Sequence, residues 1–315
     1  MKPIPINGIR LGPGVIWTGQ DSSRPSPLFP VCQALSTQRI NMVCAGLHRL
    51  GKHEWFSCCV ESRYREVVAR LADEDGSVST PADVIQVSVY PHRYRIDVPA
   101  VLMKMLATAD IPFYHLVSSS AVISVIIDTR YQDQVIALLE DTFDLPASHT
   151  PYIQEIDQEI SALLKKYPET RSTYVEEKIR TYGIQLIPGV TLLQMQEDQG
   201  RLMQMRHRLI SAVESDTQFH LVSVIQTAGR KLDAVFVLKL DADRTDGAES
   251  GDLITFHGPH FGDRYRIFQS ALNCLEIDHI PLRAAACAGA SISLVFPAGE
   301  GAVAQTALAK GFEAP

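Results

Sequence analysis

Two hydrophobic patterns alternate along the chain, one with the period of strands and one with the period of helices. Residues 84–90 and 122–128 are rich in β-branched side chains, which is typical of buried strands. Residues 98–108 and 131–143 place apolar side chains three and four positions apart, which predicts amphipathic helices. The same order returns near the C-terminus over 253–257, 267–278, 282–288, 291–296 and 302–310. This order predicts a four-stranded antiparallel sheet with both helices on one face.

The two halves of the chain also resemble each other in sequence. Gly8–Val15 recurs as Gly183–Val190, so that position 8 aligns with position 183. Further along, the run 40–61 aligns with 219–240. Such self-similarity is the mark of a repeated architecture. We therefore expect two similar halves, each made of two units.

A difference between the halves lies in the middle of each repeat. The run 111–126 aligns with 280–295, and this shift is shorter than the one that aligns position 40 with position 219, so the second half has lost residues before this point. In the first half the interval holds a helical pattern over 62–71, whereas the second half has turn residues over 243–248. The second half is therefore predicted to lack one short helix.

These patterns predict an α+β protein of four ferredoxin-like βαββαβ units in two repeated halves. The expected boundaries are 1–80 for an irregular first unit, 81–148 for the second, 149–181 for a helical connector, 182–248 for a short third unit and 249–315 for the fourth. The units should pair into eight-stranded antiparallel sheets with helices on one face, because exposed sheet edges are costly. We expect units two and four to pair, and the other two likewise. Gly12-Pro13-Gly14 is interpreted as a turn.

Composition narrows the class of protein. The chain has 315 residues, 46% hydrophobic and 21% charged, which indicates a globular protein of more than one domain. A net charge of −7 disfavours a nucleic-acid partner. The lack of a long apolar run and of a secretory leader predicts a cytoplasmic protein without a membrane partner. The six cysteines show no CxxC spacing, which favours reduced, buried thiols over disulfides or metal ligands.

One run of residues points to a family. Leu116–Asp128, with the sequence LVSSSAVISVIID, is followed by a helical pattern that ends at Phe143. It resembles the second ACT unit of aspartokinases, where a run of the type I-S-T-S-x-x-x-I-S-V-x-V-D leads into an A-x-x-x-L-x-x-x-F helix. Residues 261–267 and Ile280-Pro281 are similar to the loop before the first ACT helix and to the start of the second ACT strand, although Tyr265-Arg266 replaces the Pro-Gly of the family.

The resemblance implies an allosteric regulatory protein that binds a free amino acid or a similar effector and signals to a partner protein. The kinase portion of aspartokinases has no counterpart here, so we expect a stand-alone protein that is not an enzyme, without catalytic residues. No cofactor or metal is implied: His257 and His260 lack a third ligand, and no phosphate-binding glycine motif occurs. A homodimer is compatible with the resemblance. Two alternatives remain, a ligand-free ACT scaffold that mediates assembly and an enzyme on a ferredoxin-like fold.

The resemblance also implies where a ligand binds, namely between two paired units, at the loop before the first helix of one and the start of the second strand of the other. The start of a helix offers free N–H groups and a partial positive charge to a carboxylate. Asp263 either holds the ammonium group or caps the helix, and the loop arginines either bind or are solvated. The candidate ligand-binding residues are His92, Arg93, Tyr94, Arg95, Ile96, Pro112, Phe113, Tyr114, Ser118, Ser119, Phe261, Gly262, Asp263, Arg264, Tyr265, Arg266, Ile267, Pro281, Leu282, Arg283 and Cys287.

The same resemblance suggests which side chain the ligand carries. Tyr114 and Arg283 align with an acidic residue that meets the ammonium tail of the ligand in lysine-binding aspartokinases. A cation at position 283 repels a cationic tail, so lysine and arginine should bind poorly. Neutral or acidic side chains should bind better. Ser118-Ser119-Ser120 indicates either a close approach of a ligand or a plain turn.

Overall fold

The structure is a computed structural model, and it describes residues 3–21, 28–51, 53–74, 82–147, 152–153, 178–214, 217–227, 230–240, 247–259, 261, 265–288 and 291–314. The elements of the first half are β1 (Ile4–Pro5), β2 (Gly8–Asp21), α1 (Leu28–Thr37), β3 (Met42–Leu50), β4 (His53–Glu61), η1 (Ser62–Tyr64), α2 (Arg65–Glu74), β5 (Ala82–Tyr90), α3 (Asp97–Thr108), β6 (Phe113–Ser118), β7 (Ile123–Asp128), η2 (Thr129–Tyr131), α4 (Gln132–Thr142), β8 (Phe143–Asp144) and β9 (Tyr152–Ile153). Those of the second half are β10 (Ile179–Arg180), β11 (Gly183–Asp198), η3 (Gln199–Arg201), α6 (Leu202–Ser211), β12 (Phe219–Thr227), β13 (Lys231–Leu238), β14 (Glu249–His257), α7 (Ile267–Ile277), β15 (Ala284–Ala288), β16 (Ser291–Pro297), α8 (Gly301–Leu308) and β17 (Phe312–Glu313).

A single large sheet organises the protein. Thirteen strands follow the order β4-β3-β15-β16-β14-β11-β13-β12-β6-β7-β5-β2-β9, and β4 also pairs with β2. The sheet therefore closes on itself as a ring of twelve strands, with β9 added beside β2. All pairings within this ring are antiparallel, which confirms the α+β class and the antiparallel sheet. The expected separate eight-stranded sheets are not formed, because the ring has no free edge at these places.

Two long strands, β2 and β11, make this closure possible. Residues Gly8–Ile16 of β2 pair with β5, whereas its residues Gly14–Asp21 pair with β4. In β11 the pairing with β14 is shifted between Ile187 and Val190, and the strand then continues along β13. Gly12-Pro13-Gly14 lies inside β2, so its interpretation as a turn is wrong. Gly14 allows a close approach here, because a Cβ on it would lie 2.8 Å from the Cys59 Sγ.

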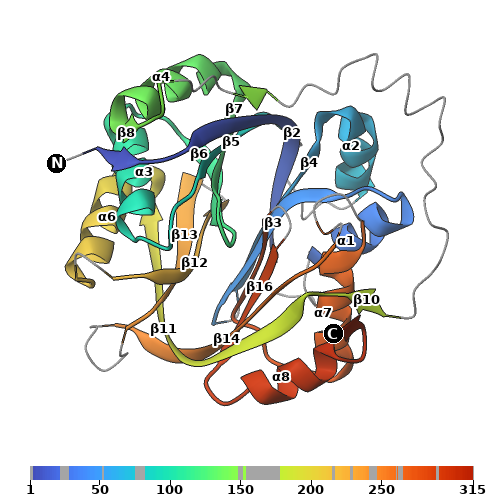
Figure 1. Cartoon of the computed structure of the whole chain (residues 1–315). Coiled ribbons are helices and arrows are strands. Elements are labelled where there is room, and N and C mark those ends of the chain that lie inside the picture. The colour runs from blue at the N-terminus through green and yellow to red at the C-terminus, as the bar shows by residue number, and fades with distance from the viewer. Residues whose placement is uncertain are drawn as a thin grey trace.

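The ring is flattened into two layers of strands, with helices on the outer face of each (Figure 1). One hydrophobic cluster lies beneath α3, α4 and α6, and another beneath α1, α7 and α8. A third cluster contains residues of strands and connecting loops and fills the space between the layers. Alternate residues of one strand serve the two sides: Leu294 packs under the helices and Val295 packs between the layers.

The contacts between the layers differ from those expected. Strand β15 pairs with β3, and β12 pairs with β6, so the segment 249–315 joins 1–80 and the segment 182–248 joins 81–148. The predicted pairing of units two and four is therefore wrong. Helices pack across the same seams, α1 on α7 and α3 on α6. A sequence repeat shows which segments are alike, but not which strand edges meet.

The helical pattern at 62–71 corresponds to η1 and α2, which confirms that helix. Between β13 and β14 the described residues 239–240 and 247–248 are bends and turns, as predicted for the second half. Of the expected helical connector, residues 154–177 lie outside the described residues. Its described ends are short strands, since β9 pairs with β2 and β10 pairs with β17, so the helix expected at these ends is not present.

Candidate functional site

Residues 91–96, which lead into α3, meet the start of β12, and we call this contact the α3 junction. The backbone N–H of Phe219 donates to the carbonyl of Tyr94 (2.9 Å), and that of Ile96 donates to the carbonyl of Thr217 (3.3 Å). Arg95 and Gln218 form an antiparallel β-bridge. The place where the resemblance implies a ligand is therefore filled by backbone hydrogen bonds of the chain itself.

The ring of His92 closes the α3 junction further. His92 is 1% exposed and its ring centroid lies 4.9 Å from that of Phe219. The N–H of Tyr94 donates to Nδ1 (2.8 Å), so Nε2 carries the proton and donates to the carbonyl of Ser119 (2.9 Å). Burial lowers the pKa of His92. The neutral imidazole is thus a structural pin that connects the loop before α3 with the end of β6.

Other candidate residues of this region have structural partners. The Oγ of Ser118 accepts from the N–H of Val222 (2.9 Å), and Ser119 bonds to Val122 within the β6–β7 turn. These contacts favour the turn interpretation of the serines. Arg95 pairs with Asp97, which lies in the first turn of α3. An acidic residue there matches the positive end of the helix, so this end is already neutralised.

The equivalent contact of the second half lies between the loop before α7 and the start of β3, and we call it the α7 junction. A cavity of about 10 Å³ lies here, room for about one water molecule. Its walls are Asn41, Met42, Phe261, Arg266, Ile267, Phe268, Cys287 and Ile292. The structure thus brings together four candidate residues of the second half. The candidates Gly262, Asp263 and Arg264 lie outside the described residues, and Tyr265 is half-buried beside this loop.

The electrostatics of the α7 junction are those of a carboxylate site. Arg266 directly precedes α7, is exposed, and has a φ of 77°, in the left-handed region that favours glycine. The first turn of α7 contains no acidic residue. The guanidinium and the free N–H groups of the helix start therefore add their positive potentials. Burial raises the pKa of Cys287 to about 12, so its thiol is neutral and adds no charge to the cavity.

Two groups of candidates lie away from these junctions. Pro112, Phe113 and Tyr114 follow the C-terminal end of α3, about 18 Å from its start for twelve residues at 1.5 Å each. Here the amide of Gln199 donates to the carbonyl of Phe113 (3.3 Å). Pro281, Leu282 and Arg283 likewise follow α7, and Arg283 pairs with Glu249 (3.1 Å). Arg283 is therefore not part of the α7 junction, and the ligand preference inferred from it does not apply there.

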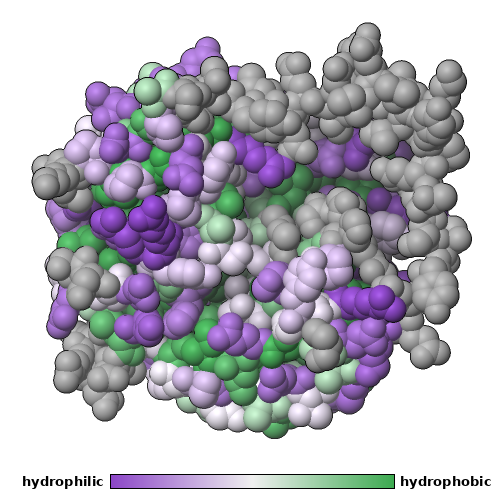
Figure 2. Space-filling model, viewed as in Figure 1, coloured by the Kyte–Doolittle hydropathy of each residue, from purple (hydrophilic) through white to green (hydrophobic). Residues whose placement is uncertain are grey.

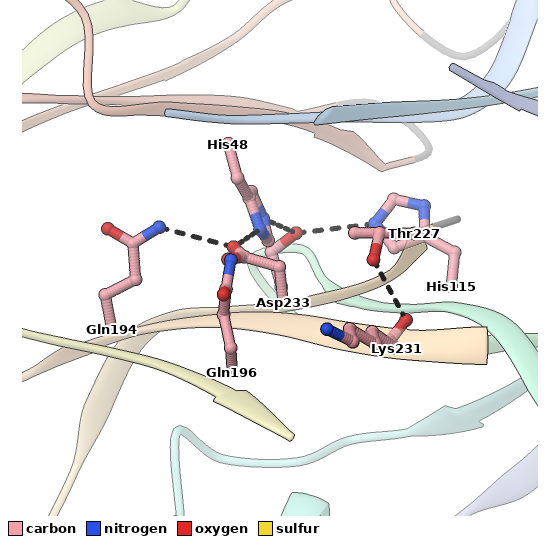
Figure 3. A network of polar contacts seen from close by, with 8 residues as sticks. His48, His115, Gln194, Gln196, Thr227, Lys231 and Asp233 are labelled. Atoms are coloured by element: carbon pink, nitrogen blue, oxygen red, sulfur yellow. Dashed lines mark hydrogen bonds and ion pairs between the residues drawn. The ribbon is translucent and has the colours of Figure 1, made fainter. Parts of the chain in front are cut away.

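A buried polar network between the two layers escaped the sequence reasoning (Figure 3). His48 of β3 lies with Nδ1 at 2.7 Å from Asp233 Oδ1 and with Nε2 at 2.8 Å from Ser223 Oγ. The amides of Gln194 and Gln196 on β11 donate to the same carboxylate, at 3.3 and 2.8 Å. Both oxygens of the Asp233 carboxylate thus have partners, as a buried charge requires. Because β3 and β13 belong to different layers, the network ties the layers together.

A second histidine extends this network. His115 of β6 lies with Nδ1 at 2.8 Å from Ser57 Oγ and with Nε2 at 3.4 Å from Ser223 Oγ. Burial, with a smaller contribution from the nearby His48, lowers the pKa of His115 from 6.5 to about 3. His115 is therefore neutral at physiological pH. Its packing is tight, since a Cβ on Gly46 would lie 2.9 Å from the ring.

Ser223, His48 and Asp233 have the hydrogen-bonding order of a serine nucleophile, its base and the group that orients the base. Ser223 is 1% exposed, and His48 and Asp233 are 0% exposed. A substrate carbonyl cannot reach a nucleophile that is covered in this way. We therefore assign the three residues to the contact between the layers. No short motif could have revealed them, because they come from three strands far apart in the sequence.

Two further classes of site were tested on the described residues. They contain no cluster of three His, Cys, Asp or Glu side chains that could hold a metal ion. All six cysteines are buried free thiols, as the sequence predicted. None of the described helices is long and apolar enough to cross a membrane.

Comparisons with known proteins give the fold. No family model matches the chain, and no curated protein matches it either. The crystal structure of aspartate kinase from Synechocystis matches 99% of the chain with a TM-score of 0.73 at 14% identity. The chain spans 56% of the length of that structure. The regulatory subunit of aspartate kinase from Thermus thermophilus, in its ligand-free form, matches 44% of the chain at 18% identity with a TM-score of 0.37, over 99% of its own length.

These comparisons correct one expectation. A stand-alone protein that is not an enzyme was expected, but the structure that matches 99% of the chain is an enzyme, an aspartate kinase. The expectation is therefore wrong. At so low a sequence identity the likeness shows the fold, and the aspartokinase-like fold agrees with the family resemblance of the sequence.

Proposed function

We propose that this chain is an ACT-type regulatory module of an aspartate-kinase-like enzyme and that it binds a free amino acid at the α7 junction. One observation carries the proposal: Arg266 and the unneutralised start of α7 meet beside a small cavity with mostly apolar walls. The carboxylate of an amino acid matches this positive potential. The likeness to an aspartate kinase over 99% of the chain supports the regulatory setting.

In this proposal the segments 1–80, 81–148, 182–248 and 249–315 are four ACT-type units. The order β15-β16-β14-β11 is that of a ferredoxin-like unit whose outer strand comes from the N-terminal part of β11. The order β6-β7-β5-β2 repeats it in the first half. The two remaining units contribute three strands each, β3-β4-β2 and β12-β13-β11. Long strands shared between units would make the module rigid.

The walls of the cavity suggest the kind of amino acid. Met42, Phe261, Ile267 and Phe268 are apolar, and Cys287 is neutral. Side chains that are small and uncharged fit such walls, whereas a charged tail would lose its hydration there. Because 10 Å³ holds about one water, an amino acid requires the loop before α7 to move away from β3.

Movement at the α7 junction has a route to the rest of the protein. Strand β3 runs from Met42, in the wall of the cavity, to His48 in the polar network. Strand β12 runs from Phe219, in the α3 junction, to Ser223 in the same network. A shift of β3 would therefore act on both layers and, through them, on the catalytic partner.

A thermal-shift screen of the whole chain with the twenty free L-amino acids tests the proposal. A ligand at one hundred times its Kd stabilises the folded state by about 2.7 kcal/mol. We expect the largest shifts with alanine, serine, threonine or valine, and small shifts with lysine and arginine.

Arg266→Gln should abolish the shift, because it removes the cation that meets the carboxylate. Arg230→Gln is a matched control, since Arg230 is also exposed and also has a left-handed φ, of 60°. This control should keep the full shift. A chain that none of the amino acids stabilises would contradict the proposal and favour the scaffold, for which the closed α3 junction is the supporting observation.

A further inference from the structure

A groove of about 650 Å³ opens beside the bend of β11, and we call it the β11 groove. Its walls are the bulge Ile187–Val190, the C-terminal end of α6 with the residues that follow (Ser211–Glu214), His220, and Leu238–Leu240. Figure 2 shows hydrophobic residues, in green, over the bend of β11 among hydrophilic ones in purple. The volume is in the range of small-molecule sites, about 300–1,000 Å³. No residue of either junction lines this groove.

The groove arises from the difference between the two halves. In the first half η1 and α2 follow β4, and η1 contacts β2. Val68 of α2 is 0% exposed and belongs to the same hydrophobic cluster as Val15 and Val60, which are partners on β2 and β4. In the second half the described residues between β13 and β14 form no helix. The place that α2 covers in the first half is therefore open in the second.

The residues of the second half are adapted to this opening. The ladder of β11 and β13 pairs Thr191 with Leu238, so the next position outward places Val190 beside Lys239. This pair corresponds to Val15 and Val60 of the first half. Val60 is fully buried, whereas Lys239 is exposed. Loss of a helix alone would leave an apolar face, which favours aggregation. A lysine at this position instead suits a groove that holds water or a polar ligand.

The charged groups of the groove are separated by sign. Lys239 and His220 lie on the strand side, close enough that the cation contributes, after burial, to lowering the pKa of His220. Glu214 lies just after the C-terminal end of α6, where the helix dipole is negative. The apolar side chains of Val190, Val213 and Leu238 complete the walls. The groove thus offers a positive side, a negative side and an apolar surface.

We propose that the β11 groove is a second binding site, for a small zwitterion of the free amino-acid class. Its carboxylate would lie by Lys239 and His220, its ammonium group by Glu214 and the end of α6, and its side chain against the apolar walls. This proposal stands apart from the α7 junction, since the two sites share no residue and lie on different parts of the ring.

Titration calorimetry on the whole chain separates the two sites. The twenty L-amino acids are titrated into the parent, into Arg266→Gln, and into two groove variants, Lys239→Met and Glu214→Gln. The Arg266→Gln protein should still bind an amino acid, with the affinity of the groove. Each groove variant should weaken this binding at least tenfold. Lys231→Met, at the other end of β13 and also exposed, is the matched control and should bind as the parent does.

The same amino acid with an acetylated nitrogen should not bind, because the cation is lost. An Arg266→Gln protein that binds no amino acid would overturn the groove proposal, and so would unchanged affinity in both groove variants. Failure at the α7 junction gives a different result, since the parent and Arg266→Gln would then show the same titration curve, and Lys239→Met would abolish it.

Discussion

The α3 junction and the α7 junction lie at equivalent positions of the two layers, and the chain builds them differently. At the α3 junction two backbone hydrogen bonds, a β-bridge and the ring of His92 connect the loop with β12. At the α7 junction a cavity lies between the loop and β3. The helix starts differ as well: Asp97 neutralises the start of α3, whereas Arg266 adds positive charge to the start of α7.

This difference teaches how a repeated fold can divide two tasks. One junction holds its pair of units in a fixed arrangement, and the other keeps a place where a ligand can change the arrangement. A device of this kind requires a rigid reference, because a ligand moves one part only relative to another. The polar network around Asp233 lies between the two junctions and provides their connection.

The largest expected effect comes from opening the closed junction. Phe219 is 1% exposed and packs on His92 and Tyr94. Phe219→Ala should therefore lower the free energy of unfolding by about 3–5 kcal/mol, measured by urea denaturation. A loss below about 1 kcal/mol would show that the α3 junction is not the rigid part of the molecule.

Acid should weaken the connection between the layers. The folded-state pKa of His115 is about 3 and its ordinary value is 6.5, so the unfolded chain takes up this proton first. Stability from this group is complete above pH 6.5 and is lost as the pH falls towards 3. Between pH 6.5 and 4.5 the loss is about 3 kcal/mol, at about 1.4 kcal/mol per pH unit.

His115→Asn provides the control for this effect, because asparagine hydrogen-bonds but does not titrate in this range. The variant should show a flatter dependence of stability on pH than the parent in denaturation series at pH 7.5, 6.5, 5.5 and 4.5. The Oγ atoms of Ser57 and Ser223 and the thiol of Cys44, 3.8 Å away, face the ring. None of them ionises in this range, so equal slopes would contradict the assignment.

A smaller effect should distinguish function from stability at the α7 junction. The left-handed φ of Arg266 costs about 1–2 kcal/mol for a residue with a Cβ. Arg266→Gly should therefore raise the free energy of unfolding by about 1 kcal/mol and at the same time weaken amino-acid binding. Arg230→Gly should give the same gain without the loss of binding. A variant of Arg266 that gains stability and keeps its affinity would remove the reason for the strained arginine.

The sequence predicted the elements better than their assembly. Periodicity located α3, β6, β7, α7 and β16 within a few residues, because each has a clear apolar pattern. It did not predict that β2 and β11 run through two layers, because a long strand with Gly and Pro inside it reads as a strand and a turn. It also did not predict which strand edges meet, because pairing depends on shapes that no local pattern encodes.

The candidate site was predicted in part. The loops before α3 and α7 were correctly chosen, and four of the candidate residues line the cavity of the α7 junction. The residues after these helices were grouped with them by the resemblance, although a helix length separates them. The network of His48, Ser223 and Asp233 was missed, because its partners lie 175 and 185 positions apart from His48. The β11 groove was missed as well, although the lost helix was a signal for it.

Hydrogen–deuterium exchange of the whole chain, with and without the amino acid that gives the largest thermal shift, tests the central claim most directly. Ligand binding at the α7 junction should slow the exchange of the amides of Ile267, Phe268 and Met42. It should leave the amides of Ile96 and Phe219 in the α3 junction unchanged, because these are already hydrogen-bonded. Protection at the α3 junction without protection at the start of α7 would contradict the division of tasks between the two junctions.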